Sequence, residues 1–282
     1  MTEANFISQE DALELIGRND VSFVDGSWYL AAQRRDAQAE YLKMRIPGAV
    51  YFDIDKIADQ SSQLPHMLPA PQQFSHDASV LGISNDDLII VYDGPGLFSA
   101  PRVWWTFKVM GAPDVRILTG GIDDWKTKNL PLETGNPNPP LARRFETNFD
   151  KNQIASLDNV QAVLNDTETV VLDARPHARF IAEAPEPREG LRGGHIPGSK
   201  SLPLNEIIEN NRLKSAHSLD EIFTSLGVGQ DTPVVTTCGS GVTAAVLILA
   251  LRESGRDNNR LYDGSWSEWG MPDGPEIEID EK

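Results

Sequence analysis

The chain repeats one series of motifs in its two halves, and this repeat constrains the fold more than any other feature. Residues 45–49 (RIPGA) are echoed by residues 195–199 (HIPGS). Gly120 precedes Trp125 at the same spacing as Gly264 precedes Trp269. A chain of 282 residues is long enough for two ordinary domains. The repeat therefore predicts two domains of like fold.

Short apolar segments alternate with amphipathic segments in both halves. Such alternation is typical of parallel sheets covered by helices on both faces, so we expect an α/β fold. Capping boxes at Ser8 with Asp11 and at Ser218 with Glu221 predict two helix starts. Residues 50–54 and 200–204 are expected to be strands that lead into short helices. The other predicted strands are 21–25, 88–93, 170–173 and 233–238.

The segment 131–140 (PLETGNPNPP) has the composition of a linker. It predicts an N-terminal domain over residues 1–135, a linker over 136–155 and a C-terminal domain over 156–282. The formal net charge of −17 disfavours nucleic acids and anionic membranes as partners. A small anionic substrate stays possible, because a few arginines can reverse the potential inside one pocket.

The longest strongly apolar run, residues 242–251, is too short to span a bilayer. The first residues show no basic start followed by an apolar stretch, as a secretory signal would, and their acidity argues against a transit peptide. The cytoplasm is therefore the expected compartment.

The chain has one cysteine, Cys238, which excludes an internal disulfide and a thiolate-rich zinc site. It lies in the loop 238–243 (CGSGVT), between a β-branched strand and a predicted helix over 244–252. Backbone N–H groups of such a loop can form an anion nest, and the helix N-terminus adds positive potential. Gly239 and Gly241 permit the positive φ that a nest often needs. Both effects favour the nucleophilic thiolate, although a buried structural cysteine is the alternative.

Two chemistries use a cysteine loop of this kind. A cysteine phosphatase needs an arginine six positions after the cysteine to clamp phosphate. That position is Ala244, and the next arginine is Arg252, well inside the predicted helix. Sulfur transfer, in which the cysteine accepts a sulfur atom and passes it on, is the better interpretation.

The repeat, the RIPGA and HIPGS motifs and the loop 238–244 together resemble the two-domain rhodanese-type sulfurtransferases. Residues 99–105 (SAPRVWW) and 262–266 (YDGSW) carry the same resemblance. Within this family the chain is most similar to the enzymes that use 3-mercaptopyruvate. The resemblance implies a catalytic second domain and a first domain without the cysteine, in keeping with Asp93 at the end of the corresponding strand.

The resemblance also assigns the substrate site. Thiosulfate-preferring relatives carry basic residues just after the cysteine, whereas Gly239 and Ser240 are uncharged, so we expect 3-mercaptopyruvate as the donor and keep thiosulfate as the alternative. Arg179 and Arg188 match the family's substrate arginines. An arginine fork suits a carboxylate, although either residue could instead pair with Glu183 or Glu186 on the surface. The loop residues expected to contact substrate are Gly239, Gly241, Val242 and Thr243.

A Ser-His-Asp relay has been proposed for the family, and the matching residues are Ser240, His66 and Asp55. Such a relay would handle protons during C–S cleavage. The alternative makes His66 an interdomain hydrogen-bonding residue and Asp55 a helix cap. The other histidines are expected to be surface or structural, and five tryptophans are expected in the core or at an interface: Trp104, Trp105, Trp125, Trp266 and Trp269.

The resulting hypothesis is an enzyme that moves sulfur from 3-mercaptopyruvate through a Cys238 persulfide and releases pyruvate. Cyanide, a small thiol or a reduced thioredoxin-type protein would accept the sulfur, and no metal or organic cofactor is implied. A third possibility is a non-catalytic module that binds a partner or carries sulfur.

Overall fold

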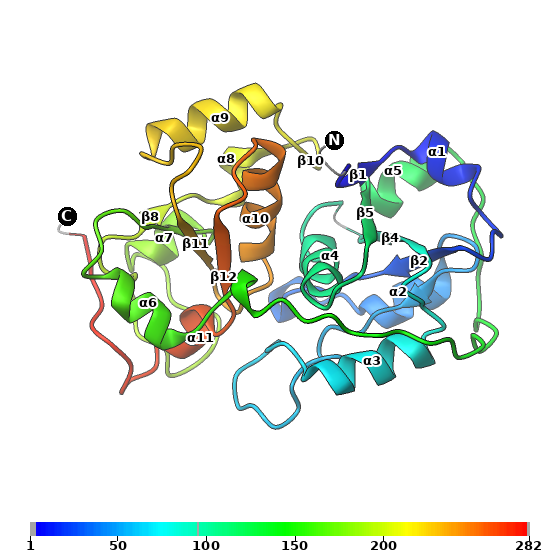
Figure 1. The fold of residues 1–282 in the computed structure, drawn as a ribbon, viewed down its shortest axis with the longest axis horizontal. Coiled ribbons are helices and arrows are strands. Elements are labelled where there is room, and N and C mark those ends of the chain that lie inside the picture. The colour runs from blue at the N-terminus through cyan, green and yellow to red at the C-terminus, as the bar shows by residue number, and fades with distance from the viewer. Residues whose placement is uncertain (1–3, 95, 281–282) are drawn as a thin grey trace. The chain divides into compact units, whose positions relative to one another are not determined.

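The computed structural model describes residues 4–94 and 96–280, and the chain divides into two compact units (Figure 1). Unit 1 holds the chain up to Gln60, then Leu68–Asp150 and the short segment Asn210–Arg212. Unit 2 holds Ser61–Met67, Lys151–Glu209 and the chain from Leu213 onward. The sequence does not predict that Ser61–Met67 belongs to unit 2 or that Asn210–Arg212 belongs to unit 1.

Unit 1 is built on a parallel five-stranded sheet in the order β1-β5-β4-β2-β3. Its strands are β1 (Phe6–Ile7), β2 (Val21–Asp25), β3 (Val50–Tyr51), β4 (Leu88–Tyr92) and β5 (Asp114–Leu118). Its helices are α1 (Gln9–Leu13), α2 (Ala37–Lys43), α3 (Pro71–Val80), α4 (Ala100–Val109) and α5 (Gly121–Thr127), with a 3₁₀ turn η1 (Ala31–Gln33).

Unit 2 repeats this sheet in the order β6-β12-β11-β7-β8, again all parallel. Its strands are β6 (Ile154–Ala155), β7 (Val170–Asp173), β8 (Lys200–Ser201), β11 (Val234–Thr237) and β12 (Asn259–Tyr262). Its helices are α6 (Leu157–Val163), α7 (His177–Phe180), α8 (Leu204–Ile207), α9 (Ala216–Ser225), α10 (Ala244–Glu253) and α11 (Ser265–Trp269), with a 3₁₀ turn η2 (Lys151–Gln153). A separate two-stranded ladder joins β9 (Ile208–Glu209) to β10 (Arg212–Leu213).

The matching strand orders confirm the predicted repeat and the α/β fold. The central strands β2, β4, β7 and β11 are rich in β-branched residues and mostly buried, as expected for parallel sheets with helices around them. The five predicted tryptophans are all fully buried, and Trp125, Trp266 and Trp269 belong to the cores of their units.

Two local predictions about helix starts have different outcomes. Ser8 caps α1 as predicted, because its side chain accepts a hydrogen bond from the Asp11 N–H. The Asp11 carboxylate accepts from the Ser8 hydroxyl and not from the Ser8 N–H, so the full capping box does not form. The predicted capping box of Ser218 with Glu221 is wrong. Helix α9 begins earlier, at Ala216, because Ser215 is the cap and its side chain accepts from the Ser218 N–H.

The segments after the two equivalent edge strands also differ from each other. In unit 2, β8 leads into α8 as predicted. In unit 1 the chain after β3 makes only turns, in which the N–H groups of Lys56 and Ile57 donate to the Asp53 carbonyl. The predicted short helix after β3 is therefore wrong.

The proline-rich segment is bound to unit 1 rather than free of it. Glu133 pairs with Arg45 through backbone hydrogen bonds, and its carboxylate accepts a hydrogen bond from Arg45 Nη2. Further along, the Arg143 N–H donates to the Ser79 carbonyl. Phe145 is buried among aromatic rings that include Phe74 and Phe107. These anchors hold residues 133–145 against unit 1, although the composition is that of a linker.

Asp25, at the end of β2, makes the stability of unit 1 depend on pH. Burial of its carboxyl group raises the pKa to about 6, from 3.8. The folded state therefore binds this proton more tightly than the unfolded state, and stability is lost as the pH rises from about 4 to about 6. Asp25→Asn removes this titration. We expect the unfolding free energy of the variant, relative to that of the wild type, to increase by up to about 3 kcal/mol between pH 4 and pH 7. Urea unfolding at several pH values measures it, and a difference that does not change with pH would contradict the assignment.

Candidate active site

Cys238 lies between the carboxyl end of β11 and the start of α10, and its residue is 2% exposed. The neighbouring α11 fixes the backbone of its loop. The Cys238 N–H donates to Ser265 Oγ at 3.2 Å, and the Trp266 N–H donates to the Cys238 carbonyl at 2.9 Å. Ser267 donates to the Gly239 carbonyl from both its N–H and its Oγ. Two serines from a distant motif therefore hold the loop in place.

The backbone of the cysteine loop fits the predicted anion nest in part. Gly241 has a φ of +76°, as the nest prediction requires, whereas Gly239 does not have a positive φ. The amides of Ser240, Val242 and Thr243 have no acceptor among the described residues of the chain. Backbone amides without an acceptor in a loop of this kind can donate to a negatively charged group.

The equivalent loop of unit 1 shows what such amides bind. There the Asp93 carboxylate turns inward and accepts hydrogen bonds from the N–H groups of Gly96, Phe98, Ser99 and Ala100, at 2.5–2.8 Å. Burial raises the pKa of Asp93, and these amide donors oppose that rise. Unit 1 thus fills its own nest with a side chain, whereas unit 2 has a thiol at the corresponding strand end.

Arg179, one of the predicted substrate residues, borders the cysteine loop and is also held in an ion pair. Its Nη2 donates to Glu186 Oε2, and a Cβ added to Gly239 would lie 3.2 Å from the same nitrogen. Glu186 also accepts from Arg175 Nη1 at 2.8 Å. The ion pair that the sequence left open as an alternative is therefore present, but beside the loop rather than on the exposed surface.

Arg188 and His66 meet at Ser240. Arg188 Nη2 donates to Ser240 Oγ at 3.4 Å, and His66 Nδ1 lies 3.0 Å from the same oxygen. His66 is 6% exposed and has a φ of +61°, a conformation that non-glycine residues seldom adopt outside functional or tightly constrained positions. The structure thus brings together two of the three residues predicted for a relay.

Asp55, the third, belongs to unit 1. Its carboxylate accepts a hydrogen bond from Trp28 Nε1 at 3.1 Å, and no helix begins at this residue. Its part in a relay stays a prediction, and the alternative role as a helix cap is wrong. Of the other histidines, His195 is buried and its Nδ1 lies 3.1 Å from the Phe180 carbonyl, whereas His76, His177 and His217 are exposed.

Comparison with known proteins places this site in a family. The model of the rhodanese-like domain matches the chain twice, over residues 8–128 and 156–271. The chain belongs to the rhodanese family. The second match contains the whole cysteine loop, and the first contains Asp93.

Full-length rhodanese relatives are similar along nearly the whole chain. The 3-mercaptopyruvate sulfurtransferase of Escherichia coli (strain K12) is 41% identical over 271 residues, which cover 96% of each chain. The human 3-mercaptopyruvate sulfurtransferase is 38% identical over 264 residues, 93% of this chain and 89% of the human protein. The crystal structure of SseA from Escherichia coli, a 3-mercaptopyruvate sulfotransferase with the rhodanese fold, superposes with a TM-score of 0.85 at 39% identity, covering 94% of this chain and all of that one.

The rhodanese loop leaves little room for a side chain at Gly239. A Cβ there would press on Arg179 Nη2 at 3.2 Å and also approach Arg188 Nη1 at 4.0 Å. If these arginines bind the donor, we expect Gly239→Ala to raise the KM for the donor about tenfold with a smaller effect on kcat. Steady-state kinetics measures this, with Gly229→Ala as a control at an exposed turn; an unchanged KM would contradict the prediction.

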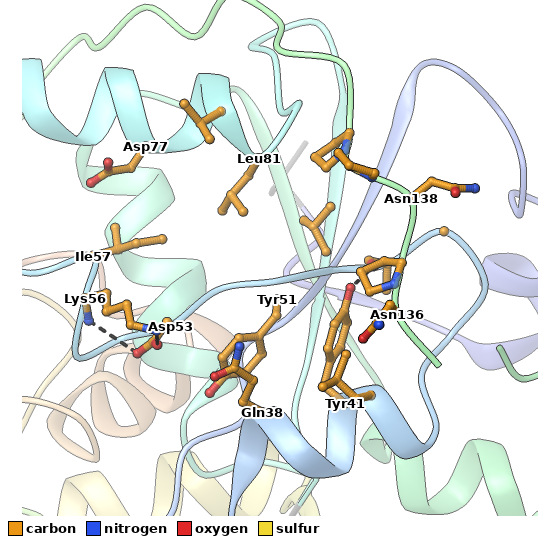
Figure 2. A pocket seen from close by; sticks show the side chains of 18 of the residues that line it. Gln38, Tyr41, Tyr51, Asp53, Lys56, Ile57, Asp77, Leu81, Asn136 and Asn138 are labelled. Carbon is orange, nitrogen blue, oxygen red and sulfur yellow. Dashed lines mark hydrogen bonds and ion pairs between the residues drawn. The ribbon is translucent and has the colours of Figure 1, made fainter. Parts of the chain in front are cut away.

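A separate cavity of about 870 Å³ lies in unit 1, between α2, α3 and the segment around Asn136 and Asn138 (Figure 2). Tyr41 and Tyr51 form one wall, and Asp53 is paired there with Lys56. None of the predicted site residues lines it. Within residues 4–94 and 96–280 there is no cluster of three potential metal ligands and no helix long and apolar enough to cross a bilayer.

Proposed function

We propose that this chain is a 3-mercaptopyruvate sulfurtransferase that carries sulfur on Cys238. The observation that supports this most is the composition of the site: a thiol in an uncharged loop with open amides, bordered by Arg179 and Arg188. The E. coli and human relatives, which carry this activity in their names, are similar over almost the entire chain.

Binding of the donor uses the cations at the edge of the loop. Arg179 and Arg188 take the carboxylate of 3-mercaptopyruvate, since a planar guanidinium can donate two parallel hydrogen bonds to it. This orientation places the donor's ketone near Ser240 and its thiol sulfur near Cys238. Arg188 Nη2 donates to Ser240 Oγ, so the cation proposed for the carboxylate and the hydroxyl proposed for the ketone lie next to each other.

In the first half-reaction, the Cys238 thiolate attacks the sulfur of the donor. An S–S bond forms and the donor's C–S bond breaks, with its electron pair left on carbon as the enolate of pyruvate. Protonation of that carbon gives pyruvate, and His66 with Ser240 is the pair placed to supply or relay the proton. The persulfide that remains on Cys238 is negatively charged once its outer sulfur loses a proton, and the loop amides stabilise it.

In the second half-reaction, a nucleophilic acceptor removes the outer sulfur. Cyanide attacks that sulfur, the S–S bond breaks with its electron pair returning to Cys238, and thiocyanate leaves. A small thiol or a reduced thioredoxin-type protein can take the place of cyanide, and the cytoplasm is the compartment we propose. The two steps make a covalent double-displacement mechanism.

Thiosulfate is the second candidate donor, and a direct comparison tests the choice. With cyanide as a common acceptor, kcat/KM is measured from thiocyanate formation for both donors. We expect a preference of about tenfold or more for 3-mercaptopyruvate, because the loop lacks the extra cations that a dianion needs. A preference for thiosulfate would refute the proposed donor while leaving sulfur transfer intact.

A further inference from the structure

A cluster of five charged side chains lies behind and beside the cysteine loop. Its members are Asp173, Arg175, Arg179, Glu186 and Arg188. Glu186 is at its centre, with a side chain only 2% exposed. It accepts hydrogen bonds from Arg175 Nη1 and from Arg179 Nη2, so its charge is shared by two arginines.

The segment that carries Glu186 is held rigidly toward the loop. Pro185 and Pro187 flank the residue, and proline restricts the backbone on both sides. Arg188 follows directly and reaches Ser240 Oγ. One short segment therefore supplies a buried negative charge beside Arg179 and a positive charge beside Ser240.

The charges of this cluster have a simple sum. Three arginines and two carboxylates leave one net positive charge. Asp173 is already matched by Arg175, whose Nε donates to it at 2.8 Å. Glu186 is thus the carboxylate that offsets the cation of Arg179 at the loop.

We propose that Glu186 is a specificity-determining residue, whose buried negative charge suits the site to a monoanionic donor and disfavours a dianionic one. This inference rests on the proposed function. A change of one unit in the charge of the cluster alters the electrostatic energy of a dianion twice as much as that of a monoanion at the same place. Because Glu186 is buried, salt screens its charge poorly. The negative charge of Glu186 therefore weakens the binding of thiosulfate more than that of 3-mercaptopyruvate, and its removal should favour thiosulfate.

The variant Glu186→Gln tests the inference, because glutamine keeps the size and one acceptor oxygen but removes the charge. We expect the ratio of kcat/KM for thiosulfate to that for 3-mercaptopyruvate to rise about tenfold. Glu189→Gln is the matched control, since it makes the same change in charge at an exposed residue of the same segment. Its ratio should equal that of the wild type.

Glu186→Asp separates charge from geometry. Aspartate keeps the negative charge but shortens the reach to both arginines, so activity should fall with both donors while their ratio stays close to the wild-type value. A ratio that shifts as far in Glu186→Asp as in Glu186→Gln would overturn the inference, and so would an unchanged ratio in a folded Glu186→Gln.

A change of the opposite sign keeps the inference testable if Glu186→Gln does not fold. Arg188→Gln and Arg188→Lys both lose the planar guanidinium that is proposed to bind the carboxylate of the donor, but only Arg188→Gln loses the positive charge at this half-buried position. The ratio should therefore be lower in Arg188→Gln than in Arg188→Lys, because thiosulfate loses more attraction than 3-mercaptopyruvate when the charge is removed. Equal ratios in the two variants, or a higher ratio in Arg188→Gln, would overturn the inference. If the wild type releases no pyruvate from 3-mercaptopyruvate, the proposed function fails instead, and that outcome is seen before any variant is compared.

Discussion

Replacing Cys238 by serine is expected to reduce pyruvate release from 3-mercaptopyruvate by at least about a thousandfold. The chain has one cysteine, so no other thiol can take over the nucleophilic step. A serine hydroxyl is not ionised at neutral pH, and the amides around it would have no persulfide to stabilise. The measurement is pyruvate formation with cyanide as the acceptor.

The fold of this variant should survive. Serine is close to cysteine in size, and the backbone contacts of residue 238 to Ser265 and Trp266 do not involve the side chain of residue 238. The thermal midpoint should therefore stay within a few degrees of the wild type, which makes the lost activity a loss of chemistry. Comparable rates in the wild type and Cys238→Ser would refute the proposed mechanism.

Replacing Arg175 by methionine is expected to lower the unfolding free energy of unit 2 by about 3–5 kcal/mol. Arg175 is fully buried, and its guanidinium donates to Asp173, to Glu186 and to the Gly194 carbonyl at 2.8 Å each. Its Cζ also lies 4.0 Å from the centre of the Trp266 ring. Methionine would leave two buried carboxylates without this cation and would release Glu186 from one side.

A matched control is available in unit 1. Asp114 and Arg116 have the same spacing as Asp173 and Arg175 and form the same kind of ion pair, but both side chains are partly exposed, at 44% and 32%. Arg116→Met should therefore cost less than about 1 kcal/mol. Denaturant unfolding followed by tryptophan fluorescence measures both variants, and equal losses would contradict the account.

The fold was predictable because it depends on features repeated along the chain. Short β-branched strands and recurring glycine motifs appear twice, and each copy forms the same parallel sheet. Cys238 could be placed at a strand end because a buried strand precedes it and an apolar helix follows. Where two local signals competed, the prediction failed: Ser215 and Ser218 are both plausible caps, and the structure uses Ser215.

The site was less predictable because its contacts join residues that are far apart in sequence. Glu183, Glu186 and Glu189 are equally plausible partners for an arginine, and only the burial of Glu186 distinguishes it. Ser265 and Ser267 hold the cysteine loop because β11 and β12 are neighbours in the sheet. Sequence spacing cannot show either fact. The prediction of Arg179 and Arg188 came from family resemblance, and the structure adds that both lie beside Gly239.

The central claim is that Cys238 holds the transferred sulfur, and intact-protein mass spectrometry tests it most directly. The wild type is treated with 3-mercaptopyruvate without an acceptor, and a portion is then given cyanide. We predict that the first sample gains the mass of one sulfur atom, that peptide analysis places it on Cys238, and that cyanide removes it. No added mass on Cys238 in a sample that still releases pyruvate would contradict the claim.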